Sequence, residues 1–120
     1  MPRERVEELA VFLRETTGEY LRGVGFYDAD DYEVLYVRPD LRRETLESEI
    51  ERMVSHLRNE SRAREQRAFP YGDLDGTVRS FEDAVVMHFP LPQEHGAIVT
   101  LDTDAARQLN EFMSECIKHL

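Results

Sequence analysis

The chain has 120 residues and carries 25 Asp and Glu against 15 Lys and Arg, a formal net charge of −10 at pH 7. This length predicts one domain over residues 1–120, because a second core needs roughly another 100 residues. The 41% hydrophobic and 33% charged content excludes a disordered chain. No stretch reaches the roughly 20 apolar residues of a membrane span. A charged start without an apolar signal core predicts a cytoplasmic protein.

The first predicted element is an amphipathic helix from Pro2 to Gly18, which are good start and stop residues. Its apolar residues form a stripe of helical spacing: Val6, Leu9, Ala10, Phe12 and Leu13. A period of two follows in residues 20–27, with Tyr20, Val24 and Phe26 on one side, and residues 32–38 are β-branched and aromatic. With the polar turn 28–31 between them, these segments predict a β-hairpin. Gly23 and Gly25 leave one face of its first strand bare, which indicates a bend or close packing against a helix or a second chain.

Pro39 ends the hairpin, and a second helix is predicted to follow it. The apolar stripe of this helix consists of Leu46, Ile50, Met53, Val54 and Leu57. Beyond Leu57 the stripe vanishes, so residues 58–67 are predicted to overhang the domain or to fray.

Three short strands are predicted next, over residues 77–82, 84–89 and 97–101, and their short links imply an antiparallel meander. Pro90 and Pro92 are assigned to the loop before the last strand. Asp102 or Thr103 is predicted to cap a final helix. The apolar stripe of that helix is the most regular in the chain: Leu109, Phe112, Met113, Cys116, Ile117 and Leu120. Cys116, the single cysteine, is therefore interpreted as a reduced core thiol.

The predicted order is helix, two strands, helix, three strands, helix. It indicates an α+β fold, an αββαβββα sandwich with a five-stranded, mainly antiparallel sheet and helices packed on it. This order resembles the Roadblock, longin and profilin-like domains. The segments DDYEVLYVR at 30–38 and GDLDGTVRSFEDAVVMHFP at 72–90 resemble a family of short, uncharacterised haloarchaeal proteins. That resemblance implies a salt-loaded habitat and names no activity.

The basic residues support the same habitat, because 14 are Arg and one, Lys118, is Lys. Surface carboxylates keep copies apart when salt screens longer-range forces, and Arg retains its pairing geometry. An acidic protein from a GC-rich genome is the alternative. The −10 charge argues against nucleic-acid binding, which depends on cations that neutralise phosphates.

The histidines are the first candidates for chemistry. His88 and His95 lie seven residues apart around a proline-bearing loop, with Glu94 adjacent, so these three are the candidate metal ligands, although a structural role is favoured. A zinc site needs three or four ligands, and the sequence has no CxxC or HExxH. The favoured interpretation of His88 is a strand histidine whose ring nitrogens are hydrogen-bonded within the protein or exposed to solvent. No catalytic residue and no cofactor are predicted. The serines lie in no glycine-flanked nucleophile elbow, and the glycines form neither a Walker loop nor a dinucleotide-binding motif.

The favoured partner-binding surface is basic and then aromatic, and lies in the most neutral part of the chain. It consists of Arg58, Arg62, Arg64, Arg67, Phe69 and Tyr71. Arg and Tyr are enriched at interfaces, although a solvated helix end explains the arginines about equally well. The hairpin edge offers a surface for a homodimer. The predicted function is a non-enzymatic protein-interaction or signalling-type module of a halophile. The alternative is a small-ligand or metal sensor, or a weak enzyme, with a pocket near His88 and His95.

Overall fold

The computed structural model describes residues 2–58 and 62–120 and has the predicted α+β architecture. Five strands form one sheet in the order β2-β1-β5-β4-β3, and every neighbouring pair is antiparallel. The hairpin consists of β1 (Leu21–Tyr27) and β2 (Tyr32–Val37). The meander consists of β3 (Thr77–Ser80), β4 (Val85–Leu91) and β5 (His95–Leu101). Both predicted strand groups are confirmed.

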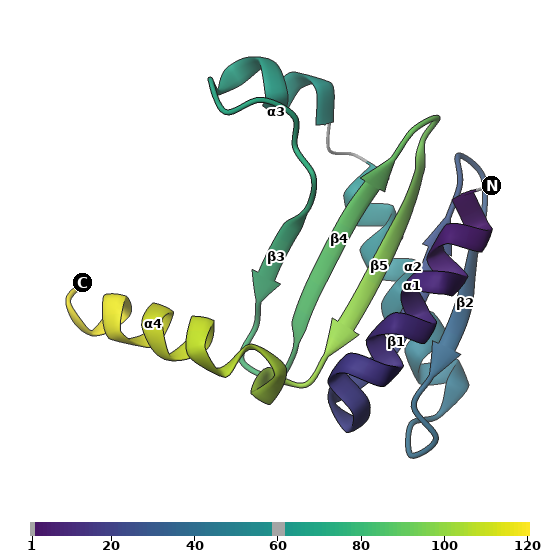
Figure 1. Ribbon diagram of the computed structural model, residues 1–120, viewed down its shortest axis with the longest axis horizontal. Coiled ribbons are helices and arrows are strands. Elements are labelled where there is room, and N and C mark those ends of the chain that lie inside the picture. Colours follow the sequence, from purple (N-terminus) through teal and green to yellow (C-terminus); the bar gives the residue numbers. More distant parts are fainter. Residues whose placement is uncertain (1, 59–61) are drawn as a thin grey trace.

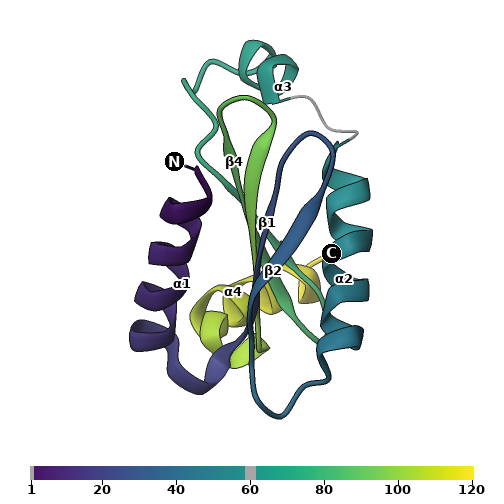
Figure 2. The same ribbon diagram turned by 90° about the vertical axis from the view of Figure 1, so that its right-hand side faces the viewer.

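Two helices cover opposite faces of the sheet (Figures 1 and 2). α1 (Pro2–Thr17) packs Val6, Ala10 and Leu13 onto one face, in contact with alternate residues of β1, β4 and β5. Phe12 is 58% exposed, so its predicted place on the stripe is wrong. At 100° per residue, Phe12 points about 120° away from Val6 around the helix. A 3₁₀ helix (Gly18–Tyr20) follows and takes Tyr20 out of the predicted strand.

α2 (Arg43–Arg58) covers the other face and buries Leu46, Ile50, Val54 and Leu57, as its predicted stripe requires. The bare glycines of β1 explain how closely it approaches. A Cβ on Gly23 would overlap Leu46, and a Cβ on Gly25 would lie 2.8 Å from Ile50 Cγ2. Close packing against a helix, one of the alternatives for these glycines, is therefore confirmed, and the register of β1 also shifts beside both of them.

The segment after α2 differs from the prediction. α2 ends at Arg58, and a separate helix, α3 (Arg62–Ala68), lies across the end of the sheet near the β4–β5 turn (Figure 1). Residues 59–61 lie outside the described part of the chain, so the predicted overhang or fraying has no outcome there. Pro90 lies within β4 rather than in the following loop, where it is paired in register with Gly96.

The last helix is present but its predicted burial is wrong. A 3₁₀ turn (Thr103–Ala106) leads into α4 (Arg107–Lys118), which projects past β3 and away from the sheet (Figure 1). None of its residues is buried, and Phe112 and Ile117 are 68% and 63% exposed. Cys116 is an exposed thiol, not the core thiol that was predicted. Helical spacing identified the helix correctly but does not identify what covers its apolar face.

Candidate functional site

A pocket of about 760 Å³ opens at the end of the sheet, where α2, α3 and the β4–β5 turn meet. α2 and α3 contribute Leu57, Arg58, Arg62 and Gln66 to its walls. The strands and the turn contribute Tyr27, His88, Glu94 and His95. The pocket thus brings together residues from both candidate sites predicted from the sequence, the arginine segment and the histidine pair.

Tyr27 and His88 form a buried polar pair in the pocket wall. A hydrogen bond of 2.7 Å joins Tyr27 Oη to His88 Nε2, and the two rings stack with 5.8 Å between their centroids. Both side chains are buried, so the bond satisfies polar atoms that would otherwise lose water. His88 is therefore a satisfied strand histidine, which is the favoured sequence interpretation.

Gly96 allows this pair to form. Gly96 lies opposite Tyr27 in the β1–β5 register, and a Cβ at this position would overlap the Tyr27 ring at Cζ, Cε1 and Oη. The absent side chain lets the tyrosine lie flat across β5 and reach His88 on β4. Gly96, far from Tyr27 in the sequence, thus makes room for the Tyr27 ring in the pocket wall.

The β4–β5 turn places His95 and Glu94 at the rim. Gln93 and Glu94 both have a φ of 62°, the left-handed conformation that a type I′ hairpin turn requires and that glycine or asparagine usually supplies. His95 Nδ1 donates to the carbonyl of Pro92 at 2.9 Å. The second ring nitrogen, Nε2, takes no part in this bond. Within residues 2–58 and 62–120, no group of three His, Cys, Asp or Glu side chains is arranged to hold a metal ion.

Arg58 connects α2 to the hairpin turn beside the pocket. Its Nη2 donates to the carbonyls of Asp28 and Asp31 at 2.9 and 3.0 Å, and its guanidinium lies 6.0 Å from the centre of the Tyr27 ring. The turn is ordered by Asp28, whose carboxylate accepts the backbone N–H groups of Asp31 and Asp30. These two bonds hold the pKa of Asp28 below its ordinary value.

Arg62 and Gln66 attach α3 to its surroundings. Arg62 donates to Gln66 Oε1 at 3.2 Å and to the Pro90 carbonyl at 3.4 Å. The same Gln66 oxygen accepts the Leu74 N–H at 2.7 Å. These contacts of Arg58 and Arg62 therefore go to carbonyl and amide oxygens, which carry no net charge.

The other predicted partner-binding residues lie outside the pocket lining. Arg64 and Arg67 are on the exposed surface of α3. Phe69 and Tyr71 follow it, 54% and 85% exposed, and their rings stack at 6.3 Å with 8° between the planes. The predicted surface therefore has two parts: Arg58 and Arg62 at the pocket, and an outer part formed by Arg64, Arg67, Phe69 and Tyr71.

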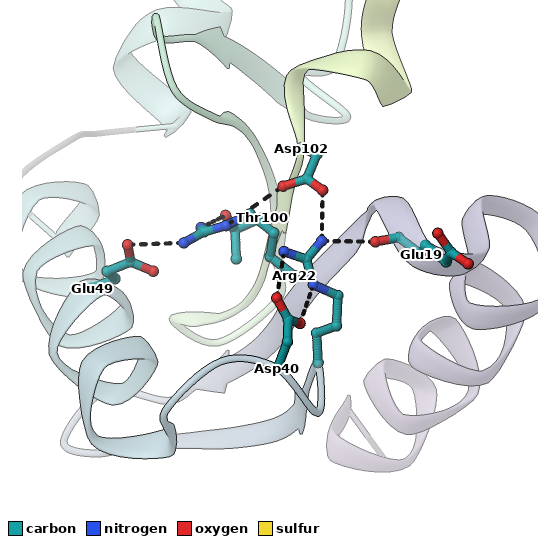
Figure 3. Close-up of polar contacts among 7 residues, drawn as sticks. Glu19, Arg22, Asp40, Glu49, Thr100 and Asp102 are labelled. Carbon is teal, nitrogen blue, oxygen red and sulfur yellow. Dashed lines mark hydrogen bonds and ion pairs between the residues drawn. The ribbon is translucent and has the colours of Figure 1, made fainter.

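A second polar cluster, which the sequence reasoning missed, lies at the opposite end of the strands (Figure 3). Arg38, at the end of β2, donates to Asp102 at 2.6 Å, to Asp40 at 2.6 Å and to the Glu19 carbonyl at 2.7 Å. Arg22 donates to Thr100 at 2.6 Å and pairs with Glu49 of α2 at 3.1 Å.

This cluster corrects the predicted role of Asp102. Asp102 stands at the cap position of the 3₁₀ turn but makes no side-chain cap hydrogen bond, because its carboxylate instead accepts from Arg38. The charges that follow β2 and β5 meet because both strands pair with β1 and end beside its first residues. Strand order, which spacing in the sequence does not contain, was the missing information.

The structure is a small α+β domain, with helices on both faces of an antiparallel sheet and an open pocket between α3 and the sheet end. A family model described as a domain of unknown function, DUF7522, matches residues 7–120, and the chain belongs to this family. Neither the curated proteins nor the solved structures gave a match. No helix in the described part of the chain is long and apolar enough to cross a membrane.

Proposed function

We propose that the domain is a non-enzymatic protein-interaction or signalling-type module that binds an acidic partner segment at the α3 end of the sheet. The supporting observation is the convergence of three features at this end. The pocket holds Arg58 and Arg62, whose described hydrogen bonds go to uncharged oxygens. Next to it, α3 carries two more arginines and leads to the exposed Phe69–Tyr71 pair.

The chemistry of the partner follows from these groups. Guanidiniums recognise carboxylates through paired N–H donors, and exposed aromatic rings bury apolar side chains at low entropic cost. The segment 58–71 contains four Arg and two Glu in a chain whose total charge is −10. A partner strand or helix that alternates acidic and apolar residues therefore matches both parts of the surface. The same total charge makes a nucleic acid an unfavourable partner.

A defined peptide tests this assignment. Fluorescence anisotropy is measured with a labelled peptide of alternating Glu and Leu and with its Gln counterpart. Arg64→Glu with Arg67→Glu is the chosen variant, because both side chains are exposed on α3, whereas Arg58 and Arg62 donate to backbone carbonyls of other elements. Arg5→Glu with Arg42→Glu makes the same charge change at exposed positions elsewhere.

We expect the acidic peptide to bind at least about tenfold tighter than the Gln peptide, and the α3 variant to lose most of that difference. The control variant should keep it. Equal binding of the two peptides, or an equal loss in both variants, would overturn the assignment.

The pocket itself favours a second candidate, a small-ligand or metal sensor that uses His88, Glu94 and His95. Its volume of about 760 Å³ lies within the range of small-molecule sites, and its wall contains the preformed Tyr27–His88 pair. A thermal-shift screen with metals and metabolites tests the sensor, because a ligand specific to the folded state raises Tm. A Tm unchanged across the panel would count against it.

We also propose that the protein works as a homodimer in a salt-rich cytoplasm. Fourteen arginines against one lysine and the −10 charge support adaptation to salt. A single cysteine suits a reducing compartment. A domain of this size gains core from a second copy.

A further inference from the structure

α4 presents an apolar face that the described residues of its own chain leave largely exposed. Its exposed apolar residues follow helical spacing along one side: Leu109, Phe112, Met113 and Ile117, with Leu120 two residues beyond the end of the helix. The start of α4 is fixed, because Asn110 accepts from Ser80 Oγ at 2.7 Å and donates to the Thr103 carbonyl at 2.9 Å. Beyond this anchor the helix projects past β3 (Figure 1). The chain thus holds an amphipathic helix out from the sheet edge.

A groove of about 770 Å³ lies nearby, between α2 and the β3–β4 end of the sheet. Its apolar walls include Ile50 and Met53 from α2, Val86 and Ile98 from the sheet, and Phe81 from the β3–β4 turn. Phe81 also lines a shallow hollow with Met113 and Ile117 of α4. The groove and the apolar face of α4 are therefore neighbours that share Phe81.

We propose that α4 of one copy occupies the α2–β3 groove of a second copy, and that the exchange is reciprocal. An amphipathic helix in an apolar groove is a recurring recognition mode, read by anchors at i, i+3, i+4 and i+7. Phe112, Met113 and Cys116 supply this spacing when counted from Leu109. The helix cannot enter its own groove while Asn110 stays bonded to Ser80 and Thr103, so a second molecule is the source of the occupant.

The exposed area is sufficient for a stable dimer. The four exposed apolar residues of α4, together with Leu120 and Phe81, expose on the order of 700 Å² in each copy, taking ~200 Å² for a large apolar side chain. Two copies reach about 1,400 Å² even before the groove walls are counted, which is the size of a standard specific interface.

Symmetry and charge favour a second copy over another protein. A twofold exchange covers the helix and the groove of both molecules at once, whereas a different partner on either surface leaves the other exposed. α4 is also electrically neutral, since Arg107 and Lys118 balance Glu111 and Glu115. Two chains of charge −10 therefore meet through a segment that adds no repulsion. This inference rests on the proposed homodimer and is independent of the proposed peptide site.

Light scattering after gel filtration in molar KCl provides the first test. The wild-type protein should have twice the 14.0 kDa mass of one chain. Phe112→Glu with Ile117→Glu should give monomers that keep their circular dichroism, because both side chains are largely exposed within one chain. Val11→Glu with Phe12→Glu is the matched control, 54% and 58% exposed on α1, and should remain dimeric.

A monomeric wild-type protein would overturn both this inference and the homodimer. A dimer that survives the α4 substitutions would overturn the inference alone and return the interface to a sheet edge.

Crosslinking gives the second test and identifies the groove. Met53→Cys adds one thiol to the groove wall, and native Cys116 lies on α4. A short bis-maleimide should then produce a covalent dimer whose linked peptides contain residues 53 and 116. The same variant with Cys116→Ser should not give this product. A link between 53 and 116 within one chain, or no such link, would overturn the exchange.

Discussion

Replacing Gly96 with alanine tests whether the Tyr27 ring depends on an absent side chain. A new Cβ would overlap the ring at Cζ, Cε1 and Oη, and Tyr27 is buried, so the ring has little room to move. Overpacking of this kind costs 1–3 kcal/mol, and we expect about 2 kcal/mol. For a domain of this size that lowers Tm by roughly 8 °C. If the new Cβ did not overlap the ring, the substitution would instead stabilise the fold by about 0.5 kcal/mol, because alanine reduces the conformational entropy of the unfolded chain.

A double-mutant cycle with Tyr27→Leu isolates the overlap. Leucine ends before the ring atoms that meet the new Cβ, so Gly96→Ala in this background should be neutral or slightly stabilising. The coupling free energy between the two positions should then be about 2.5 kcal/mol, measured by urea unfolding of all four proteins. A Gly96→Ala cost that is equal in both backgrounds would refute the explanation, and strain elsewhere in the β4–β5 turn would replace it.

Three further predictions concern charge. Arg38→Ala should destabilise the fold by about 1–3 kcal/mol in urea unfolding, because the bonds of a mostly buried guanidinium to two carboxylates are lost. Arg38→Lys should recover only part of this stability, because lysine lacks the planar guanidinium. Full recovery by lysine would contradict a role for the guanidinium geometry. Helical circular dichroism should fall when molar salt is reduced to low millimolar, as unscreened carboxylates repel; equal signals would refute salt adaptation. Hydrogen bonds from Asp31 N–H, Arg3 and Arg38 lower the pKa values of Asp28, Glu33 and Asp40, respectively. Their stabilisation is present above the ordinary carboxyl pKa and lost below it, so Tm in molar salt should decline below about pH 4. A Tm that rises on acidification would show that relief of repulsion dominates.

The sequence was sufficient for the sheet and for the helices that cover it. Val6, Ala10 and Leu13 on α1 and Leu46, Ile50 and Val54 on α2 repeat at helical spacing because each set faces one side of a packed sheet. The strands were identified from their alternation and turn residues for the same reason. Local periodicity records burial directly, so these elements could be predicted without a partner structure.

The sequence did not predict which elements and side chains lie next to one another in the fold. Leu109 and Phe112 have the spacing of a core stripe, yet they are exposed, because spacing shows that a face is apolar and not what covers it. Predicting the pocket would have required the order of the strands in the sheet. Tyr27 and His88 are 61 positions apart, and they meet because β5, between β1 and β4, carries a glycine at the crossing point. The predicted histidine pair and arginine segment were both real neighbours of this pocket, but no pattern in the sequence joined them.

The central pairing of β1 with β5 has a consequence for how the protein is made. Residues 21–27 leave the ribosome long before residues 95–101, yet the two segments lie side by side in the middle of the sheet. Until β5 emerges, the β1–β2 hairpin also exposes the edge of β1 that β5 later covers, and neither helix has a complete surface to pack against. Contacts of such long sequence separation slow folding. The sheet is therefore completed only after most of the chain has been synthesised, and the nascent hairpin is the segment most in need of protection from other chains.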